Sequence, residues 1–209
     1  MSRKLHFPDL SAIVLAGGQS RRMGQNKASL LIEGQTLLEH LLGQLQGRFK
    51  EIIVSLSSKQ KVPVNLALIV QDLYEGAGPL AGILSGLKVC QSEVALVLTV
   101  DQPEVNFRLV REMLALMTDL ELVYPMIEGK IPHPLFALYH KRTIPVMEEL
   151  IGQGKLSPLE LLNRVQARSL TVSTAEIPWN LNTPEDFNRY LRYYKHKKAK
   201  AETPQEPKG

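Results

Sequence analysis

The sequence has little of several features that would direct its interpretation. It contains a single cysteine among 209 residues, so no disulfide can form within the chain, and this suits a reducing cytoplasm. No apolar run approaches the length that spans a bilayer, and the first residues, MSRKLHFPDL, lack the apolar core of a secretory signal. We therefore expect a cytoplasmic protein with no membrane partner.

Excess charge is also small. The formal net charge is +4 at pH 7, and part of it comes from residues 195–200 (KHKKAK). No recognisable nucleic-acid motif is present, so we expect no nucleic-acid partner. The hydrophobic content of 44% and the charged content of 22% are typical of a globular domain, and 209 residues can bury a core without disulfides.

A glycine-rich segment follows the first apolar run. Residues 11–15 (SAIVL) are too short and too aliphatic for a helix and predict a buried parallel strand. Gly17 and Gly18 follow where such a strand delivers its carboxyl end to a ligand. Glycines let backbone N–H groups approach anionic oxygens closely. The segment therefore predicts a phosphate-binding loop.

The same segment carries positive charge. Arg21, Arg22 and Lys27 lie within residues 15–27 (LAGGQSRRMGQNK), whose spacing is neither GxxxxGK[ST] nor GxGxxG. A surface loop without a ligand is the alternative. We favour an anion site, because several cations so close to a strand-terminal Gly-Gly pair rarely lack an anion to bind.

Short apolar runs alternate with helical patterns along the rest of the chain. This order predicts a single-domain, Rossmann-like α/β fold, a three-layer α/β/α sandwich around a mostly parallel sheet. We expect strands over residues 11–15, 51–56, 65–70, 94–100, 121–125, 135–139 and 168–172. We expect helices over residues 36–46, 79–90, 106–117, 145–152 and 156–164, and from residue 184.

Two acidic residues stand out within this pattern. Asp101 follows the β-branched run 94–100 (VALVLTV), at the end of a predicted central strand, where such sheets place ligands and metals. Since Mg²⁺ prefers oxygen ligands and often takes one or two protein carboxylates, Asp101 is the candidate metal ligand. A turn-capping role before Pro103 is compatible with this. Asp72 precedes a helix whose first amides, from Gly78, could bind an anion or a base edge, although it could also be a solvated loop acid.

A third segment, residues 179–187 (WNLNTPEDF), contains two asparagines. A helix-capping turn explains Thr183, Pro184 and Glu185, but neither Asn180 nor Asn182. We therefore favour a binding role for the two asparagines.

Three of these segments together resemble one family. LAGGQSRRMGQNK, TVDQP and NLNTPED stand in the order of the signatures of nucleotidyltransferases that attach a nucleoside monophosphate to a sugar, alditol or pterin phosphate. The AGG form is similar to that of the molybdenum cofactor guanylyltransferases. The resemblance spans residues 11–192, so we expect an N-terminal extension over residues 1–10 and a nucleotidyltransferase domain over 11–194. The charged, proline-containing composition of residues 195–209 predicts a disordered tail.

The resemblance also implies roles for particular residues. Phosphate binding and catalysis would fall to Arg21, Arg22, Lys27 and Asp101, with Mg²⁺ on Asp101. The nucleotide would contact Leu15, Ala16, Gly17, Gly18, Lys27, Ser57, Asp72, Gly78 and Asp101. Asn180 and Asn182 would bind the acceptor. The family often has an asparagine just after the second strand, where this chain reads VSLSS, so Ser57 stands at or near that position with a shorter reach.

The implied reaction transfers GMP from GTP to molybdopterin, releases pyrophosphate and forms molybdopterin guanine dinucleotide. An acceptor phosphate is largely dianionic at neutral pH, so no general base is required, in agreement with a sequence that shows no Ser/His/Asp or Cys/His set. Contact with a molybdenum-insertion protein and with a molybdoenzyme or its chaperone is implied as well. A cytidylyl- or uridylyltransferase acting on a pterin, alditol or sugar phosphate is the alternative. A further alternative is a regulatory nucleotide-binding module without turnover. The presence of both Asp101 and Lys27 argues against it, because such a module could bind a nucleotide without a metal-binding carboxylate.

Overall fold

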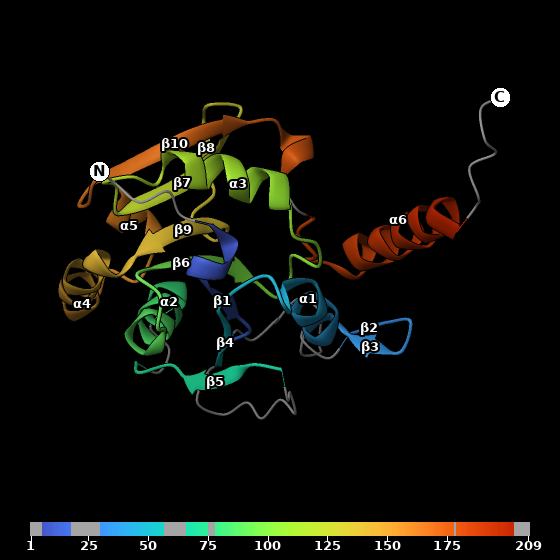
Figure 1. Cartoon of the computed structure of the whole chain (residues 1–209), viewed down its shortest axis with the longest axis horizontal. Coiled ribbons are helices and arrows are strands. Elements are labelled where there is room, and N and C mark those ends of the chain that lie inside the picture. The colour runs from blue at the N-terminus through green and yellow to red at the C-terminus, as the bar shows by residue number, and fades with distance from the viewer. Residues whose placement is uncertain (1–5, 18–29, 57–65, 75–77, 178, 203–209) are drawn as a thin grey trace.

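A mixed sheet forms the centre of the computed structural model, which describes residues 6–17, 30–56, 66–74, 78–177 and 179–202 (Figure 1). The strand order is β10-β7-β9-β6-β1-β4-β5, with β8 paired to β7. The strands are β1 (Ser11–Leu15), β4 (Glu51–Leu56), β5 (Leu68–Gln71), β6 (Val94–Thr99), β7 (Leu122–Ile127), β8 (Ile131–Pro132), β9 (Ala137–His140) and β10 (Ala167–Val172). A separate antiparallel pair joins β2 (Leu31–Ile32) to β3 (Gln35–Thr36).

Most strands of this sheet run in one direction. β1 is parallel to β4 and β6, β4 is parallel to β5, and β7 is parallel to β10. β9 is antiparallel to both of its neighbours, β6 and β7, and so restores the common direction on its far side. The prediction of a mostly parallel α/β sheet is confirmed.

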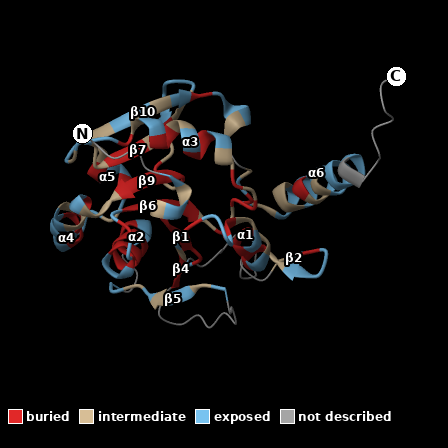
Figure 2. Cartoon of the chain, viewed as in Figure 1, coloured by how far each residue is buried: buried red, intermediate tan, exposed pale blue. Residues whose placement is uncertain are grey.

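Helices cover both faces of the sheet. They are α1 (Leu37–Leu45), α2 (Gly78–Val89), α3 (Phe107–Leu116), α4 (Ile144–Gly152), α5 (Pro158–Leu162) and α6 (Pro184–Glu202), with 3₁₀ turns at Phe7–Asp9, Lys141–Thr143 and Thr174–Glu176. Side chains alternate along β1, so Ala12 and Val14 share a core with α1 and α3, whereas Ile13 and Leu15 share one with α2 and α4. Figure 2 shows the burial concentrated in the sheet and on the inner sides of these helices. The three-layer prediction is therefore confirmed.

Local capping signals set several helix starts. The Thr36 hydroxyl accepts a bond from the Glu39 amide at 3.1 Å, and the Thr36 amide donates to the Glu39 carboxylate at 2.8 Å, so the two residues form a capping box at the start of α1. Asn106 caps α3 by accepting from the Leu109 amide at 3.1 Å. These helices begin where the sequence predicts.

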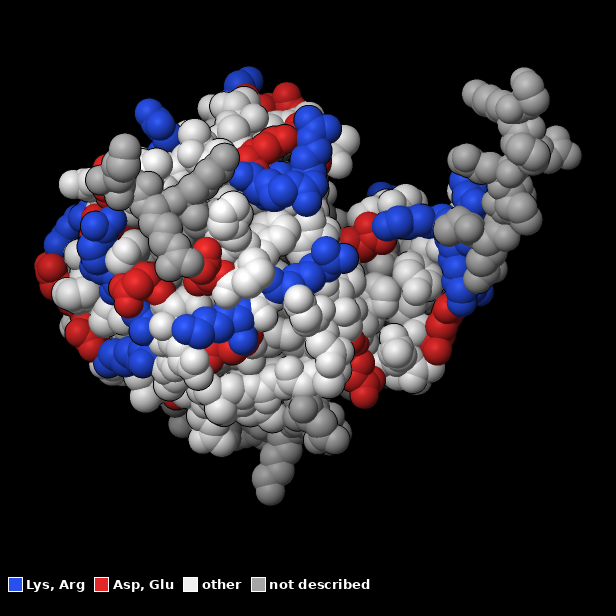
Figure 3. Space-filling view, in the orientation of Figure 1, with Lys and Arg blue, Asp and Glu red and all other residues white. Residues whose placement is uncertain are grey.

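The end of α6 differs from the prediction. Composition predicted a disordered tail from residue 195, but the helix continues to Glu202. Lys197 Nζ lies 2.9 Å from Glu104 Oε1, and Lys198 Nζ lies 2.7 Å from Glu33 Oε2, so both lysines reach acidic groups on other elements. α6 projects from the body in Figure 1, and Lys and Arg side chains gather toward its outer end in Figure 3, where they suit the negative end of the helix dipole. The tail prediction is wrong for residues 195–202, and residues 203–209 lie outside the described part of the chain.

Among the helices of the described residues, none combines the length and the apolar character that a membrane crossing needs.

Candidate functional site

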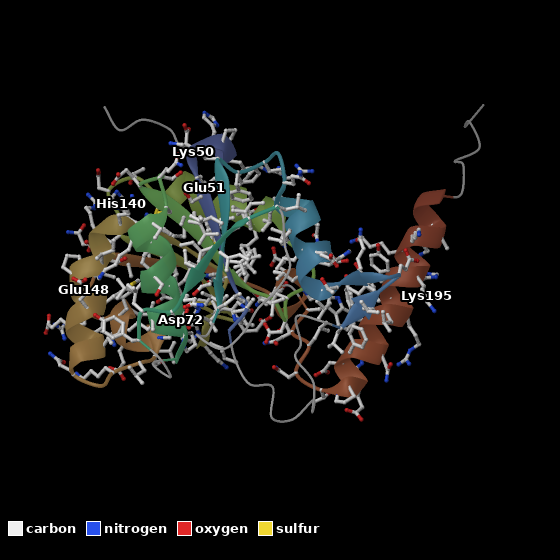
Figure 4. The ribbon with its side chains drawn as sticks, turned by 90° about the horizontal axis from the view of Figure 1, so that it is seen from below. Lys50, Glu51, Asp72, His140, Glu148 and Lys195 are labelled. Atoms are coloured by element: carbon white, nitrogen blue, oxygen red, sulfur yellow. The ribbon has the colours of Figure 1, made fainter. Side chains whose placement is uncertain are left out.

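The candidate site lies at the carboxyl edge of the parallel strands. Leu15 pairs with Ser55 on β4 and with Thr99 on β6, so these strands end at the same level. In Figure 4, Asp72 lies well apart from Lys50, Glu51 and His140, which mark the opposite edge. The ends of β1, β4, β5 and β6 therefore meet at one edge, as expected for a ligand site in such a sheet.

The first loop is anchored on both sides. The Ala16 amide donates to the Ser55 carbonyl at 2.9 Å, and the Val100 amide donates to the Leu15 carbonyl at 3.0 Å. The side chains of Leu15 and Ala16 are buried, whereas Gly17 is exposed. Of these predicted nucleotide contacts, Gly17 is thus the one that the fold presents to solvent.

Five predicted site residues lie outside the described part of the chain. They are Gly18, Arg21, Arg22, Lys27 and Ser57. Their roles in phosphate and base binding stay predictions.

Asp72 is held by the strand beside it. Its amide donates to the Leu56 carbonyl at 2.9 Å, and the Ser55 hydroxyl donates to its Oδ1. The carboxyl is half-buried, and desolvation raises its pKa, while the bond from Ser55 opposes this rise. Asp72 is therefore a positioned carboxylate, and the alternative of a freely solvated loop acid does not fit.

Helix α2 begins beside this carboxylate. Gly78, its first residue, has a φ of +65°, and a Cβ there would lie 3.3 Å from the Leu156 carbonyl oxygen, so the position favours glycine. One turn further on, a Cβ on Gly82 would lie 3.1 Å from Ser55 Oγ and 3.4 Å from Asp72 Oδ1. The first turns of α2 thus lie directly against the Ser55–Asp72 pair.

Asp101 lies at the end of β6. The Thr99 hydroxyl donates to its Oδ1 at 2.5 Å, and the Leu181 amide donates to its carbonyl oxygen at 2.9 Å. Leu181 is fully buried, and its neighbours in the sequence, Asn180 and Asn182, are exposed. Since Leu181 is bonded to Asp101, the fold brings the predicted metal ligand close to the predicted acceptor residues.

The turn before α6 is capped by Thr183 and Asp186. The Thr183 hydroxyl accepts from the Asp186 amide at 3.1 Å, and the Asp186 carboxylate accepts from the Thr183 amide at 3.0 Å. The backbone amide of Asn182 also donates to Asp186, at 3.2 Å. Capping therefore uses Thr183 and Asp186, where Glu185 was expected, and Asn180 and Asn182 are both exposed.

Sequence reasoning missed three residues at this edge. One is Ser55, because a strand residue gives no local sign of its partner on the next strand. The others are Gln102, which is buried, and His133, whose Nε2 lies 2.6 Å from Gln102 Nε2. Desolvation lowers the pKa of His133, and the charge of Asp101 opposes this. The position of Gln102, directly after the candidate metal ligand Asp101, was the signal that the sequence offered.

The edge thus joins a carboxylate near the start of α2 to a carboxylate beside two exposed asparagines, with the end of β1 between them in the strand order. Taken with the comparisons, this arrangement defines the protein as a nucleotidyltransferase. Residues 12–170 match the MobA-like NTP transferase domain, and the chain belongs to this family.

Curated relatives agree with this assignment. A protein of Bacillus cytotoxicus named "Probable molybdenum cofactor guanylyltransferase" is 30% identical over 192 residues, covering 87% of this chain and 96% of the relative. A protein of the same name from Bacillus cereus strain ZK / E33L is 31% identical over 187 residues, covering 85% and 93%. The resemblance to the molybdenum cofactor guanylyltransferases is confirmed.

A solved structure supports the fold. Molybdopterin-guanine dinucleotide biosynthesis protein A from Archaeoglobus fulgidus superposes with a TM-score of 0.74 at 23% identity, covering 90% of this chain and 100% of that one. At this identity the likeness bears on the fold alone.

Proposed function

We propose that the protein transfers GMP from GTP to molybdopterin, forming molybdopterin guanine dinucleotide and pyrophosphate. The observation that carries this proposal is the bond of 2.9 Å between the Leu181 amide and the Asp101 carbonyl, which joins the strand end beside the nucleotide loop to the asparagines. The names of the relatives support the choice of substrates. The reaction would take place in the cytoplasm, beside the proteins that insert molybdenum and receive the cofactor.

A phosphate oxygen of the acceptor attacks the α-phosphorus of GTP, the bond from the α-phosphorus to the bridging oxygen breaks, and pyrophosphate leaves with its charge. The acceptor oxygen is already ionised at neutral pH, so the protein has to bring two anions together and align them. Asn180 and Asn182 bind the acceptor through their amides, and Arg21, Arg22 and Lys27 neutralise the phosphates.

Asp101 suits a magnesium ion. It offers hard carboxylate oxygens at a strand end, and the donor bond from Thr99 fixes the carboxylate. When bound there, Mg²⁺ would neutralise charge on the phosphate oxygens of GTP. Thr99 and the buried strand β6 hold the carboxylate in place for this role.

Nucleotide selectivity tests the proposal. GTP, CTP, UTP and ATP would be titrated with Mg²⁺ into the wild type, Asp101→Ala and Asp119→Ala, the last an exposed acidic control on a loop after α3. We expect GTP to bind most tightly, with weaker binding only in Asp101→Ala, and pyrophosphate release only after molybdopterin is added. A preference for CTP or UTP would replace the guanylyl assignment with a cytidylyl or uridylyl one, and absence of nucleotide binding would reject the proposal.

A further inference from the structure

A serine and a carboxylate meet on two neighbouring strands beside the start of α2. Ser55 is almost completely buried, with 2% of its surface exposed, and its hydroxyl donates to Asp72 Oδ1. Within the described residues, no hydrogen bond reaches the other carboxylate oxygen, Oδ2. The hydroxyl therefore fixes the plane of the carboxylate from the protein side and leaves acceptor capacity on the opposite side.

Helix α2 packs directly against Ser55 and Asp72. A Cβ on Gly82 would lie 3.1 Å from both Ser55 Oγ and Leu15 Cδ2, so the helix backbone sits as close to Ser55 as a glycine allows. Ser85, one turn later, accepts a bond of 2.9 Å from the Leu73 amide and donates one of 2.8 Å to the Ala81 carbonyl. The residue after Asp72 is thus tied to α2, and the backbone and the side chain of Asp72 are both held.

We propose that Ser55 is a positioning residue for base selection, acting through Asp72, with Gly82 and Ser85 of α2 keeping the pair in place. The proposal rests on the proposed function, because it assumes that a guanine base binds at this carboxylate. Guanine offers N1–H and N2–H₂ donors on one edge, and an ionised carboxylate is an acceptor-only group that matches them. Adenine has an acceptor at N1 and no 2-amino group, so the same carboxylate disfavours it.

The direction of the Ser55 bond gives it a specific effect. A hydroxyl that donates to a half-buried carboxylate stabilises the ionised, acceptor-only form and restricts its rotation. Without Ser55 the carboxylate turns more freely, and both donor bonds from guanine weaken. Hypoxanthine keeps N1–H but lacks the 2-amino group. Removal of Ser55 should therefore weaken the binding of hypoxanthine less than that of guanine, and the difference reports the contact of the 2-amino group.

The chain provides a matched control. Ser11 is also fully buried on a strand of the same sheet, and its hydroxyl donates at 2.6 Å to Glu51 Oε1, at the opposite edge. Replacing it with alanine removes a comparable serine-to-carboxylate bond far from the candidate site. Any general effect of losing such a bond would therefore appear in both variants.

The experiment measures the affinities of GTP, ITP, ATP and inorganic tripolyphosphate, each with Mg²⁺, for the full chain, Ser55→Ala and Ser11→Ala. We expect the preference for GTP over ATP to fall about tenfold in Ser55→Ala, the size of one hydrogen bond to a charged group. The preference for ITP over ATP should fall by less. Ser11→Ala keeps the wild-type preference, and tripolyphosphate, which has no base, binds all three proteins equally.

An unchanged GTP preference in Ser55→Ala would overturn the inference, and so would an equal loss in Ser11→Ala. If Ser55→Ala does not fold, Ser55→Cys keeps nearly the same volume with a weaker donor and should show the same selective loss. A wild type that does not prefer GTP would instead reject the proposed function, so the two failures are distinguishable.

Discussion

The Leu181 amide and the Asp101 carbonyl oxygen lie 2.9 Å apart in a hydrogen bond between the loop after β6 and the segment before α6. Leu181 is fully buried, so the segment cannot shift without exposing an apolar side chain. The groups proposed to bind the metal and the acceptor therefore lie on two loops that are held together by the fold.

The first prediction concerns the Asp101 carboxylate. Asp101→Asn keeps the size of the side chain and removes its charge, so we expect turnover to fall at least about a hundredfold, since the charge stabilisation that a bound metal supplies is worth several kcal/mol. Pyrophosphate release at saturating GTP and Mg²⁺ measures this. Asp119→Asn, an exposed control, should retain wild-type turnover. Equal activity of the two variants would contradict a metal role for Asp101.

A second prediction separates acceptor binding from nucleotide binding. Asn180→Ala and Asn182→Ala each remove an exposed side-chain amide, while the Thr183–Asp186 bonds that cap α6 remain, so their folds should be preserved. We expect the KM for molybdopterin to rise about threefold to tenfold, the value of one neutral hydrogen bond, while GTP affinity stays unchanged. Asn188→Ala, on the exposed side of α6, is the control. A comparable loss of GTP affinity would place the asparagines on the nucleotide side instead.

Local signals explain which parts of the fold could be predicted. Thr36 and Asn106 cap their helices through bonds to residues three positions along the chain, and such bonds depend on nearby sequence alone. The apolar run that forms β6 is buried over Val94–Leu98, as a central strand between β1 and β9 must be. The carboxyl-edge position of Asp101 follows directly from that strand.

The remaining features depend on contacts between distant segments. The bond from Ser55 to Asp72 requires the register in which Leu56 pairs with Gln71, and no local pattern reports that register. The strand predicted over residues 65–70 is Leu68–Gln71, an edge strand with Leu68 half exposed, because only one side of it has a partner. α6 is likewise longer than its composition suggests, since its lysines find Glu104 and Glu33 only in the fold.

A third prediction tests the packing that brings α2 down onto the sheet. A Cβ on Gly86 would lie 2.7 Å from Ile13 Cγ2 and 2.9 Å from Ile13 Cδ1, in a fully buried part of the core. We expect Gly86→Ala to lower the free energy of unfolding by about 1–2 kcal/mol, because overpacking outweighs the better helix propensity of alanine. Urea denaturation with an unchanged m-value measures the loss.

Gly43→Ala is the matched control for this prediction. Gly43 lies within α1, and a Cβ there would meet nothing within 4 Å. Alanine should therefore raise the free energy of unfolding by about 0.5–1 kcal/mol through helix propensity alone. Equal stabilisation in Gly86→Ala would show that α2 does not lie as close to Ile13 as the structure has it.

The last prediction concerns pH. Desolvation raises the pKa of Asp72 above that of an ordinary aspartate, and the Ser55 hydroxyl limits the rise. A carboxyl group with a raised pKa becomes protonated at a higher pH, and the protonated form can no longer accept two donor bonds from guanine. We therefore expect the preference for GTP over ITP to be complete at neutral pH and to decrease as the pH is lowered, at a higher pH than an ordinary aspartate would require. The triphosphate groups of the two nucleotides titrate alike, so their contribution cancels in the ratio.

Ser55→Ala tests the direction in which the pH dependence shifts. Because the Ser55 bond lowers the pKa of Asp72, its removal should shift the loss of selectivity to higher pH, whereas Ser11→Ala should follow the wild-type curve. Affinities of GTP and ITP measured across the range for all three proteins would show the shift. A selectivity that does not change with pH in any of them would mean that Asp72 does not contact the base edge, and a shift to lower pH in Ser55→Ala would mean that the hydroxyl does not stabilise the ionised carboxylate.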